Sequence, residues 1–397
     1  MPHAMPHTMP RALRRVSWTL ALAACTAHGP APARVDAEIA PPAVSGPRPA
    51  PSAPPPPSQV AHPPVAVAAT PAGDAEAAAE APEPAEPTAA RGPDLTAFDA
   101  LEPDPPPPSL TRNSHYWVSN EHGHHLWREA VEGLGGGYVG VGTDQNYLLA
   151  AWARSEVVVL LDFDQAISDL HHVYFLLLRD AATPEDFLAS WRPEAAPHVE
   201  ARIALVYAEH PRREAITRAF RRSRKLVYAR LRRVARTYRR LGVGTFLTDA
   251  AQYEHLRSLV SQGRVFTIRG DLTGDRAMRS VAAAFAAANV PVNVLYLSNA
   301  EQYFEYGPSF RRNVLALPFG PHAVVLRTLG WSGHGFVEGE KYHYNVQPAA
   351  NFARWMRVRR VPSAGIMLSR KRPTDVPGSS ILDYDPPPSP RPPVIAP

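Results

Sequence analysis

Proline distribution constrains this chain more than any other feature of its sequence. Of its 45 prolines, 23 lie between Pro30 and Pro108, in a stretch with almost no aromatic residues and no apolar periodicity. Such a stretch cannot bury enough apolar surface to offset the entropy lost on ordering. We therefore expect a Pro/Ala-rich disordered tether at residues 26–112 and a Pro-rich disordered tail at residues 358–397. One folded domain is expected at residues 113–357.

The first 25 residues have the order of a secretory signal peptide. Arg11, Arg14 and Arg15 precede an apolar run that is too short to span a bilayer, and small residues follow it. The tetrad Leu-Ala-Ala-Cys that ends at Cys25 resembles the lipobox of bacterial lipoproteins, whose cysteine thiol takes a diacylglyceryl group. This resemblance implies that residues 1–25 are a lipoprotein signal peptide and that Cys25 is the lipidation site. An ordinary signal peptide with a chance cysteine is the alternative.

Lipidation of Cys25 implies an exported, membrane-anchored protein. Thr26 and Ala27 supply no acidic retention signal, which favours the outer membrane or the cell surface. Cys25 is also the only cysteine of the chain. Disulfides, cysteine metal sites and a cysteine nucleophile are therefore excluded from the domain.

Strands and helices alternate along the predicted domain. Apolar runs predict strands at residues 138–141, 156–163, 264–269, 292–297 and 323–328, with helical patterns between them. This alternation predicts an α/β fold with a doubly wound, mostly parallel sheet. About a hundred residues separate the second and third predicted strands, so we expect a basic helical insertion at residues 165–263.

A long basic helix is predicted at residues 212–240 of this insertion. Residues 211–240 contain 13 Lys and Arg residues against one acid, Glu214. Six apolar residues share one side of the helix: Ile216, Phe220, Leu226, Val227, Leu231 and Val234. The basic side is interpreted first as a solvated face, whose arginine stems cover the core, and second as a surface for anionic lipid headgroups. No nucleic-acid partner is expected, because an exported protein seldom meets one.

The first two predicted strands have the order of a nucleotide-binding unit. A glycine-rich segment at residues 135–142 leads into a helix, and the second strand ends in Asp162 and Asp164. Asp162 follows Gly142 by 20 residues. In a βαβ unit of this kind, glycines let the backbone approach a ligand and the acid holds ribose hydroxyls.

This order resembles the Rossmann-like domain of class I S-adenosylmethionine-dependent methyltransferases. The resemblance implies cofactor contacts at Gly140, Gly142, Asp162 or Asp164, and Asp271, with Asn299 in the motif that closes the fourth strand. S-adenosylmethionine is implied by this resemblance alone, and it should be scarce outside the cytoplasm. Two positions depart from the family: Tyr138 stands where an acid is usual, and Asp144 replaces the third glycine.

A second resemblance rests on three short motifs. Val141–Asn146, Ser119–Glu121 and Ser298–Tyr303 look like motifs of a poorly characterised group of bacterial proteins, some of them lipoproteins. That group implies a fold but no settled reaction.

The three motifs are expected to converge on one ligand pocket. Two of them follow the carboxyl ends of neighbouring predicted strands, where open α/β sheets bind ligands. Candidate catalytic residues are Asp144, Asn299 and Glu301. Candidate ligand contacts are Ser119, Asn120, Glu121, Gln145, Asn146, Gln302 and Tyr303. The alternative is that these side chains form helix caps and turns.

The sequence predicts neither a metal site nor any of three common catalytic motifs. His115, His122, His124 and His125 have no clear carboxylate partner other than Glu121, so no metal site is expected. No Walker loop, nucleophile elbow or His-Glu-x-x-His motif is present.

Two functions remain open. We expect a domain that binds a nucleoside-like or other polar ligand, with no reaction assigned. The alternative is a non-catalytic ligand- or glycan-binding module on the cell surface.

Overall fold

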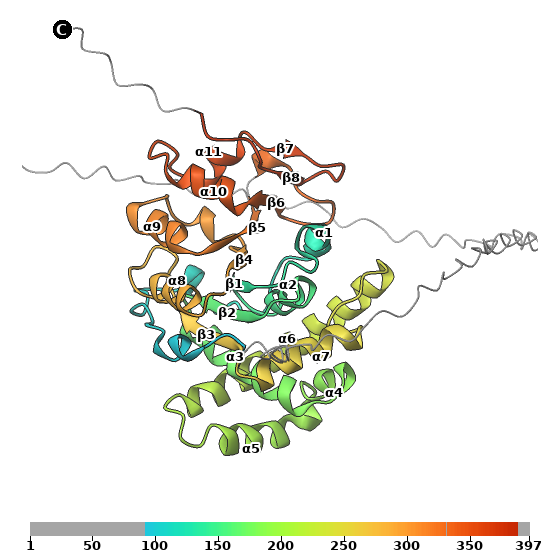
Figure 1. Ribbon diagram of the computed structural model, residues 1–397. Coiled ribbons are helices and arrows are strands. Elements are labelled where there is room, and N and C mark those ends of the chain that lie inside the picture. The colour runs from blue at the N-terminus through green and yellow to red at the C-terminus, as the bar shows by residue number, and fades with distance from the viewer. Residues whose placement is uncertain (1–91, 331, 388–397) are drawn as a thin grey trace, which may run out of the picture. The chain divides into compact units, whose positions relative to one another are not determined.

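The computed structural model describes residues 92–330 and 332–387 (Figure 1). The predicted signal peptide, Cys25 and most of the predicted tether lie outside these residues. Within them, no helix combines the length and the apolar character that a bilayer crossing requires.

An eight-stranded sheet forms the centre of the domain, in the order β3-β2-β1-β4-β5-β6-β8-β7. The strands are β1 Gly137–Val141, β2 Val157–Asp162, β3 Val265–Arg269, β4 Val292–Tyr296, β5 Phe319–Leu329, β6 His343–Pro348, β7 Arg372–Pro373 and β8 Ser379–Ile381. Neighbouring strands among β1 to β5 pair in parallel, and β6 runs antiparallel to β5. The predicted α/β fold with a mostly parallel sheet is confirmed.

Helices connect the strands. The α-helices are α1 Arg128–Val131, α2 Gln145–Ala153, α3 Gln165–Asp180, α4 Pro184–Ala189, α5 Ala196–Val206, α6 Arg213–Arg240, α7 Ala250–Ser261, α8 Ala277–Ala287, α9 Pro308–Ala316, α10 Ala349–Met356 and α11 Ala364–Leu368. Short 3-10 helices are η1 Thr96–Ala100, η2 Thr111–Asn113, η3 His124–Trp127, η4 Pro193–Ala195, η5 Ala300–Gln302 and η6 Ser332–His334.

Two hydrophobic cores lie on the two faces of the sheet (Figure 1). Side chains alternate along β2, so Val158 and Leu160 join one core while Val157, Val159 and Leu161 join the other. Helices α1 to α7 cover the first face, and α8 to α11 cover the second. Both faces of the parallel strands are therefore buried, which explains the continuous apolar run of β2.

The predicted insertion consists of α3 to α7, which lie between β2 and β3 in the chain. Helix α6 packs against α3 and α5. Five of the six apolar residues predicted for its inner side are buried, but Leu226 is 52% exposed. Leu226 lies at the edge of the apolar stripe and faces solvent.

Both predicted boundaries of the domain are wrong, because folded structure extends past each of them. Upstream of residue 113, the Phe98 ring is buried against Phe266 and Phe285. Downstream of residue 357, α11 and the last two strands complete the structure, and Leu382 is fully buried. Phe98 and Leu382 are flanked by proline-rich sequence, and the packing of such apolar side chains against the core orders both segments.

Candidate functional site

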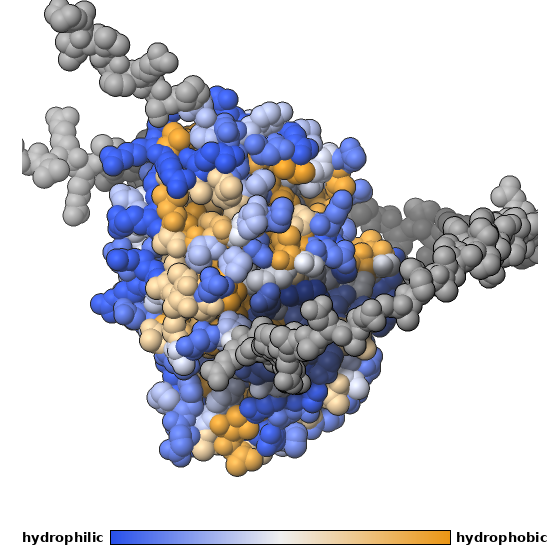
Figure 2. Space-filling model, viewed as in Figure 1, coloured by the Kyte–Doolittle hydropathy of each residue, from blue (hydrophilic) through white to orange (hydrophobic). Residues whose placement is uncertain are grey.

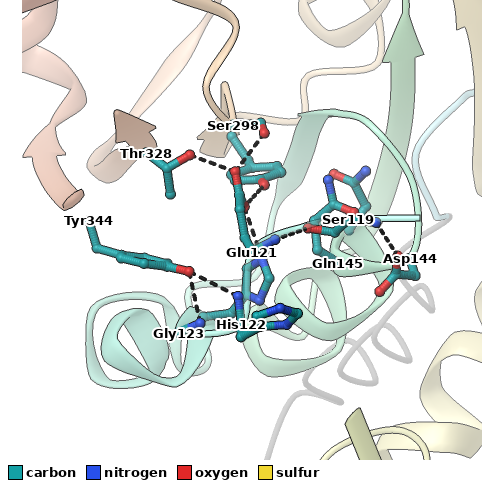
Figure 3. A network of polar contacts seen from close by, with 12 residues as sticks. Ser119, Glu121, His122, Gly123, Asp144, Gln145, Ser298, Thr328 and Tyr344 are labelled. Carbon is teal, nitrogen blue, oxygen red and sulfur yellow. Dashed lines mark hydrogen bonds and ion pairs between the residues drawn. The ribbon is translucent and has the colours of Figure 1, made fainter. Parts of the chain in front are cut away.

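The segment before α1 contacts the carboxyl ends of β1, β4 and β5, and Glu121 is its buried centre (Figure 3). The Glu121 side chain is fully buried. Its Oε1 accepts hydrogen bonds from Ser298 at 2.7 Å and from Thr328 at 2.5 Å. Its Oε2 accepts one from Tyr296 at 2.5 Å and lies 3.1 Å from Nε2 of His124. Partners from distant parts of the chain therefore surround one carboxylate.

The Glu121 carboxylate is held in its ionised form. Burial on its own raises the pKa of this carboxyl, but the hydrogen bond and charge of His124, together with the Thr328 and Tyr296 hydroxyls, lower it below its ordinary value. The same charge and burial raise the pKa of the Tyr296 hydroxyl well above its ordinary value. Tyr296 therefore stays a donor to Glu121 and does not act as a base near neutral pH.

A second buried charge lies beside the first. Asp144 and Arg230 are 1% and 4% exposed. Asp144 Oδ1 accepts a hydrogen bond from the backbone N–H of Ser119 at 2.7 Å, and its Oδ2 accepts one from Arg230 Nε at 2.7 Å. Arg230 also donates to the backbone oxygen of Glu121 at 2.8 Å. Asp144 is thus saturated by the segment that carries Glu121 and by α6.

His122 completes this arrangement as a neutral acceptor. Burial, and then the charge of Arg230, lowers the pKa of His122 to about 4. Its Nδ1 lies 2.6 Å from Nη1 of Arg230, so the unprotonated nitrogen accepts the guanidinium hydrogen. The structure therefore brings the first motif together with the second through Asp144, and with the third through Ser298. The polar groups of the three motifs that meet here form their hydrogen bonds within this network.

The glycine-rich turn is filled by the chain's own side chains. A Cβ atom on Gly140 would lie 2.1 Å from Asn146 Oδ1 and 2.5 Å from the Tyr138 ring. Gly142 has a φ of +93°, and its Cβ would lie 2.4 Å from Gln145 Nε2. The Tyr138 hydroxyl donates to Asn146 Oδ1 at 2.7 Å. Close packing of these side chains explains both glycines without a cofactor.

Glu301 lies apart from this network, on the other face of the sheet. It is fully buried, and its carboxylate accepts hydrogen bonds from Arg327 and Tyr306, each at 2.5 Å. Arg327 also donates to Asn345 and Gln347. Asp144 and Glu301 therefore do not face one pocket, since Asp144 pairs with Arg230 and Glu301 pairs with Arg327.

The acids predicted to contact a cofactor have three different environments. Asp164 caps α3 by accepting from the backbone N–H of Ala166, and its other oxygen lies 2.7 Å from Nδ1 of His115. Asp271 is exposed, and its Oδ1 accepts hydrogen bonds from the backbone N–H and the hydroxyl of Thr273, as in a turn. Asp162 accepts only the backbone N–H of Asp164, and among the described residues its Oδ2 has no hydrogen-bond partner. Burial raises the pKa of Asp162 to about 7, against the backbone hydrogen bond that lowers it.

Two exposed rings, one exposed amide and one partly buried amide lie beside the buried network. Tyr116 is 43% exposed and Tyr303 is 58% exposed. The pKa of Tyr342 is raised to about 12, chiefly by burial and next by the charge of Glu121. Tyr303 and Tyr116 lie close enough to Tyr342 to raise its pKa as well. Asn120 is exposed and hydrogen-bonds to Tyr342, and the side chain of Asn299 has no partner among the described residues. We call Tyr116, Asn120, Asn299 and Tyr303 the rim.

Several residues of the network escaped the sequence reasoning. Tyr296 and Thr328 lie in the predicted strands at residues 292–297 and 323–328, and an apolar run does not mark a hydroxyl as the donor to a buried acid. Arg230 was one of 13 similar residues, yet it follows Val227 by three positions and precedes Val234 by four. That spacing puts it on the apolar side of α6, and a charge there signals a buried partner. His124 carried its own signal, because it follows Glu121 by three residues.

The described residues contain no group of three or more His, Cys, Asp or Glu that could hold a metal ion. No curated protein matches the chain. Among protein families, residues 116–383 match the Domain of unknown function (DUF7790), a span that includes the three motifs, all of α6 and the last strand. The chain therefore belongs to the DUF7790 family.

Proposed function

We propose that this chain is an exported protein, lipid-anchored through Cys25, whose domain binds a hydroxyl-rich ligand with an apolar ring face, as a surface glycan has. The ligand would lie on the rim, and the domain would not turn it over. The observation that carries this proposal is the contrast between the saturated motifs and the exposed rings beside them. Both acids assigned to catalysis are buried and paired with arginines, so neither is free to accept a proton.

The chemistry of the rim suits such a ligand. Tyrosine combines a large apolar ring with a polar hydroxyl. Tyrosine and asparagine together provide contact area and adaptable hydrogen bonds in binding surfaces. The rim lies beside the Glu121 network, which fixes the carboxyl end of β4 through the hydrogen bond of Tyr296.

A nucleoside-like ligand is the second candidate, and one observation favours it. Asp162 ends β2, where the class I methyltransferase resemblance implies a ribose contact, and its Oδ2 has no hydrogen-bond partner among the described residues. Under this alternative, S-adenosylmethionine or a related molecule would bind over β2 rather than against the filled glycine turn. A reaction would then need an acceptor group other than Asp144 or Glu301.

A thermal-shift screen separates the two candidates. The full chain is heated with a panel of oligosaccharides, and separately with S-adenosylmethionine, S-adenosylhomocysteine and nucleotides. A ligand at a hundred times its Kd stabilises the fold by about 2.7 kcal/mol, which is a readily measured rise in Tm. We expect an oligosaccharide to give the shift.

Three variants assign the shift to a site. Tyr303→Ala should abolish an oligosaccharide shift and Asp162→Asn should leave it intact. Tyr384→Ala is the matched control, because Tyr384 is 56% exposed but lies beyond β8. A shift from an adenosyl ligand that Asp162→Asn removes would reject the glycan proposal in favour of the second candidate.

A further inference from the structure

From Arg222 to its C-terminus, α6 presents a stripe of exposed basic side chains. The stripe consists of Arg222, Lys225, Arg232, Arg233, Arg236, Arg239 and Arg240, all exposed. At 3.6 residues per turn, their positions fall within about a third of the helix circumference, so they share one side of the helix. The opposite side is buried and includes Val227, Leu231 and Val234. The stripe therefore faces outward along its whole length, which is about 27 Å at 1.5 Å per residue.

The stripe differs from the part of the same helix that precedes it in its partners. Before Arg222, Arg218 pairs with Glu214 and Arg221 pairs with Glu200. Within the described part of the chain, no carboxylate forms an ion pair with any residue of the stripe. Seven like charges on one surface repel one another, so a partner of opposite charge would be attracted to it. Figure 2 shows hydrophilic residues over the region of α6 and α7.

Exposed leucines indicate what kind of anion fits. Leu226 and Leu241, which flank the stripe, are 52% and 49% exposed. Basic residues with apolar neighbours on one helix are characteristic of binding to a membrane interface, where leucines enter the acyl boundary and arginines bind phosphates.

We propose that the stripe docks the domain on an anionic lipid surface. Arginines bind the headgroup phosphates, and Leu226 enters the interface beside them. This contact is separate from ligand binding at the rim. It is also separate from the acyl anchor at Cys25, which would hold the chain near a membrane without fixing the orientation of the domain. Docking through α6 would fix that orientation.

Vesicle co-sedimentation tests the proposal. The full chain carrying Cys25→Ser is mixed with vesicles of phosphatidylcholine alone, or of phosphatidylcholine with phosphatidylglycerol. Binding should need phosphatidylglycerol and should weaken as salt is raised. The triple variant Arg233→Gln, Arg236→Gln, Arg240→Gln should lose about fivefold per residue, or about a hundredfold in all. Leu226→Ala should weaken vesicle binding further.

A matched triple variant makes the result specific. Arg213→Gln, Arg218→Gln and Arg221→Gln remove the same charge from the first half of α6, so they should change vesicle affinity by less than about threefold. Circular dichroism checks that every variant keeps its helix. Equal losses of vesicle affinity in the two triple variants would show that binding depends on net charge alone, and would reject the stripe as a site. Tighter binding to a DNA duplex than to vesicles, unaffected by Leu226→Ala, would also overturn the proposal.

Discussion

Asp144 shows how a side chain that suggests chemistry can instead hold the fold together. Its carboxylate joins the segment before α1 to α6, and Arg230 is its buried counter-charge. A buried ion pair adds little over an apolar pair, yet removing one member is costly because the other charge is left unpaired. Asn299 is the opposite case, since its side chain has no partner among the described residues. The two residues should therefore differ sharply in their effect on stability.

We predict that Asp144→Ala lowers the free energy of unfolding by about 3–5 kcal/mol, because Arg230 stays buried without its partner. Asn299→Ala should change it by less than about 0.5 kcal/mol, because the partly buried Asn299 side chain has no hydrogen-bond partner to lose among the described residues. Urea denaturation of the two variants and the unmodified chain measures both values. A small loss for Asp144→Ala would return that residue to the list of candidate ligand contacts.

Asp162 is predicted to make stability fall as pH rises. Its pKa is raised from 3.8 to about 7 in the folded state, mainly by burial, so the folded chain binds the proton more tightly than the unfolded chain. The cost of ionising it is absent below pH 4, grows between pH 4 and 7, and is complete above pH 7. Asp162→Asn removes this cost and should stabilise the fold by about 1–2 kcal/mol at pH 8, less than a full burial penalty because the side chain keeps some solvent contact.

The measurement is the difference between Asp162→Asn and the unmodified chain in urea midpoints at pH 4 and pH 8. The difference matters because five histidines with pKa values lowered to about 4 act in the opposite direction in both proteins. These histidines are His122, His171, His172, His255 and His343. A difference that is equal at the two pH values would show that Asp162 is not the titrating group.

At the scale of elements, apolar patterning predicted β1 to β5 to within a few residues but missed β6. The reason is chemical. Along β6, His343, Asn345 and Gln347 are all buried, and they are satisfied by Arg327 and Ser380. Tyr344 and Val346 alternate with these polar residues, so β6 has no continuous apolar run of the kind that predicted β1 to β5, and only its partners show that its polar face is buried. The same limit applies to the site. The three motifs could be recognised in the sequence, but the hydrogen bonds that join them depend on contacts across the whole domain.

The elements after residue 357 are predicted to be essential to the domain. A chain of residues 113–357 would lose Phe98, α11, β8 and Leu382, and would expose the second core and the edge of β6. We expect it to be unfolded or aggregated, whereas residues 92–387 should fold. Circular dichroism and urea denaturation of the two fragments test this. Cooperative unfolding of the shorter fragment at a similar midpoint would contradict it.

At the scale of the whole molecule, membrane attachment through Cys25 remains a prediction, because that residue lies outside the described residues. Replacing Cys25 with Ser removes the thiol that would carry the diacylglyceryl group. We expect the variant to accumulate unprocessed or to leave the membrane fraction, because a single cysteine thiol would carry the acyl chains that hold the protein there. Fractionation and mass spectrometry of the N-terminus measure both outcomes. Identical processing and fractionation of the variant would show that Cys25 is not modified.

The carboxylate of Glu121 has partners that lie far downstream in the chain. Tyr296, Ser298 and Thr328 are 175, 177 and 207 residues away. A chain that is made or translocated from its N-terminus exposes Glu121 long before these hydroxyls are available, and contacts of such high sequence separation form slowly. Burial of this charge must therefore come late in folding, after β4 and β5 have joined the sheet. Until then the carboxylate stays hydrated, because a buried charge without these partners would be unfavourable.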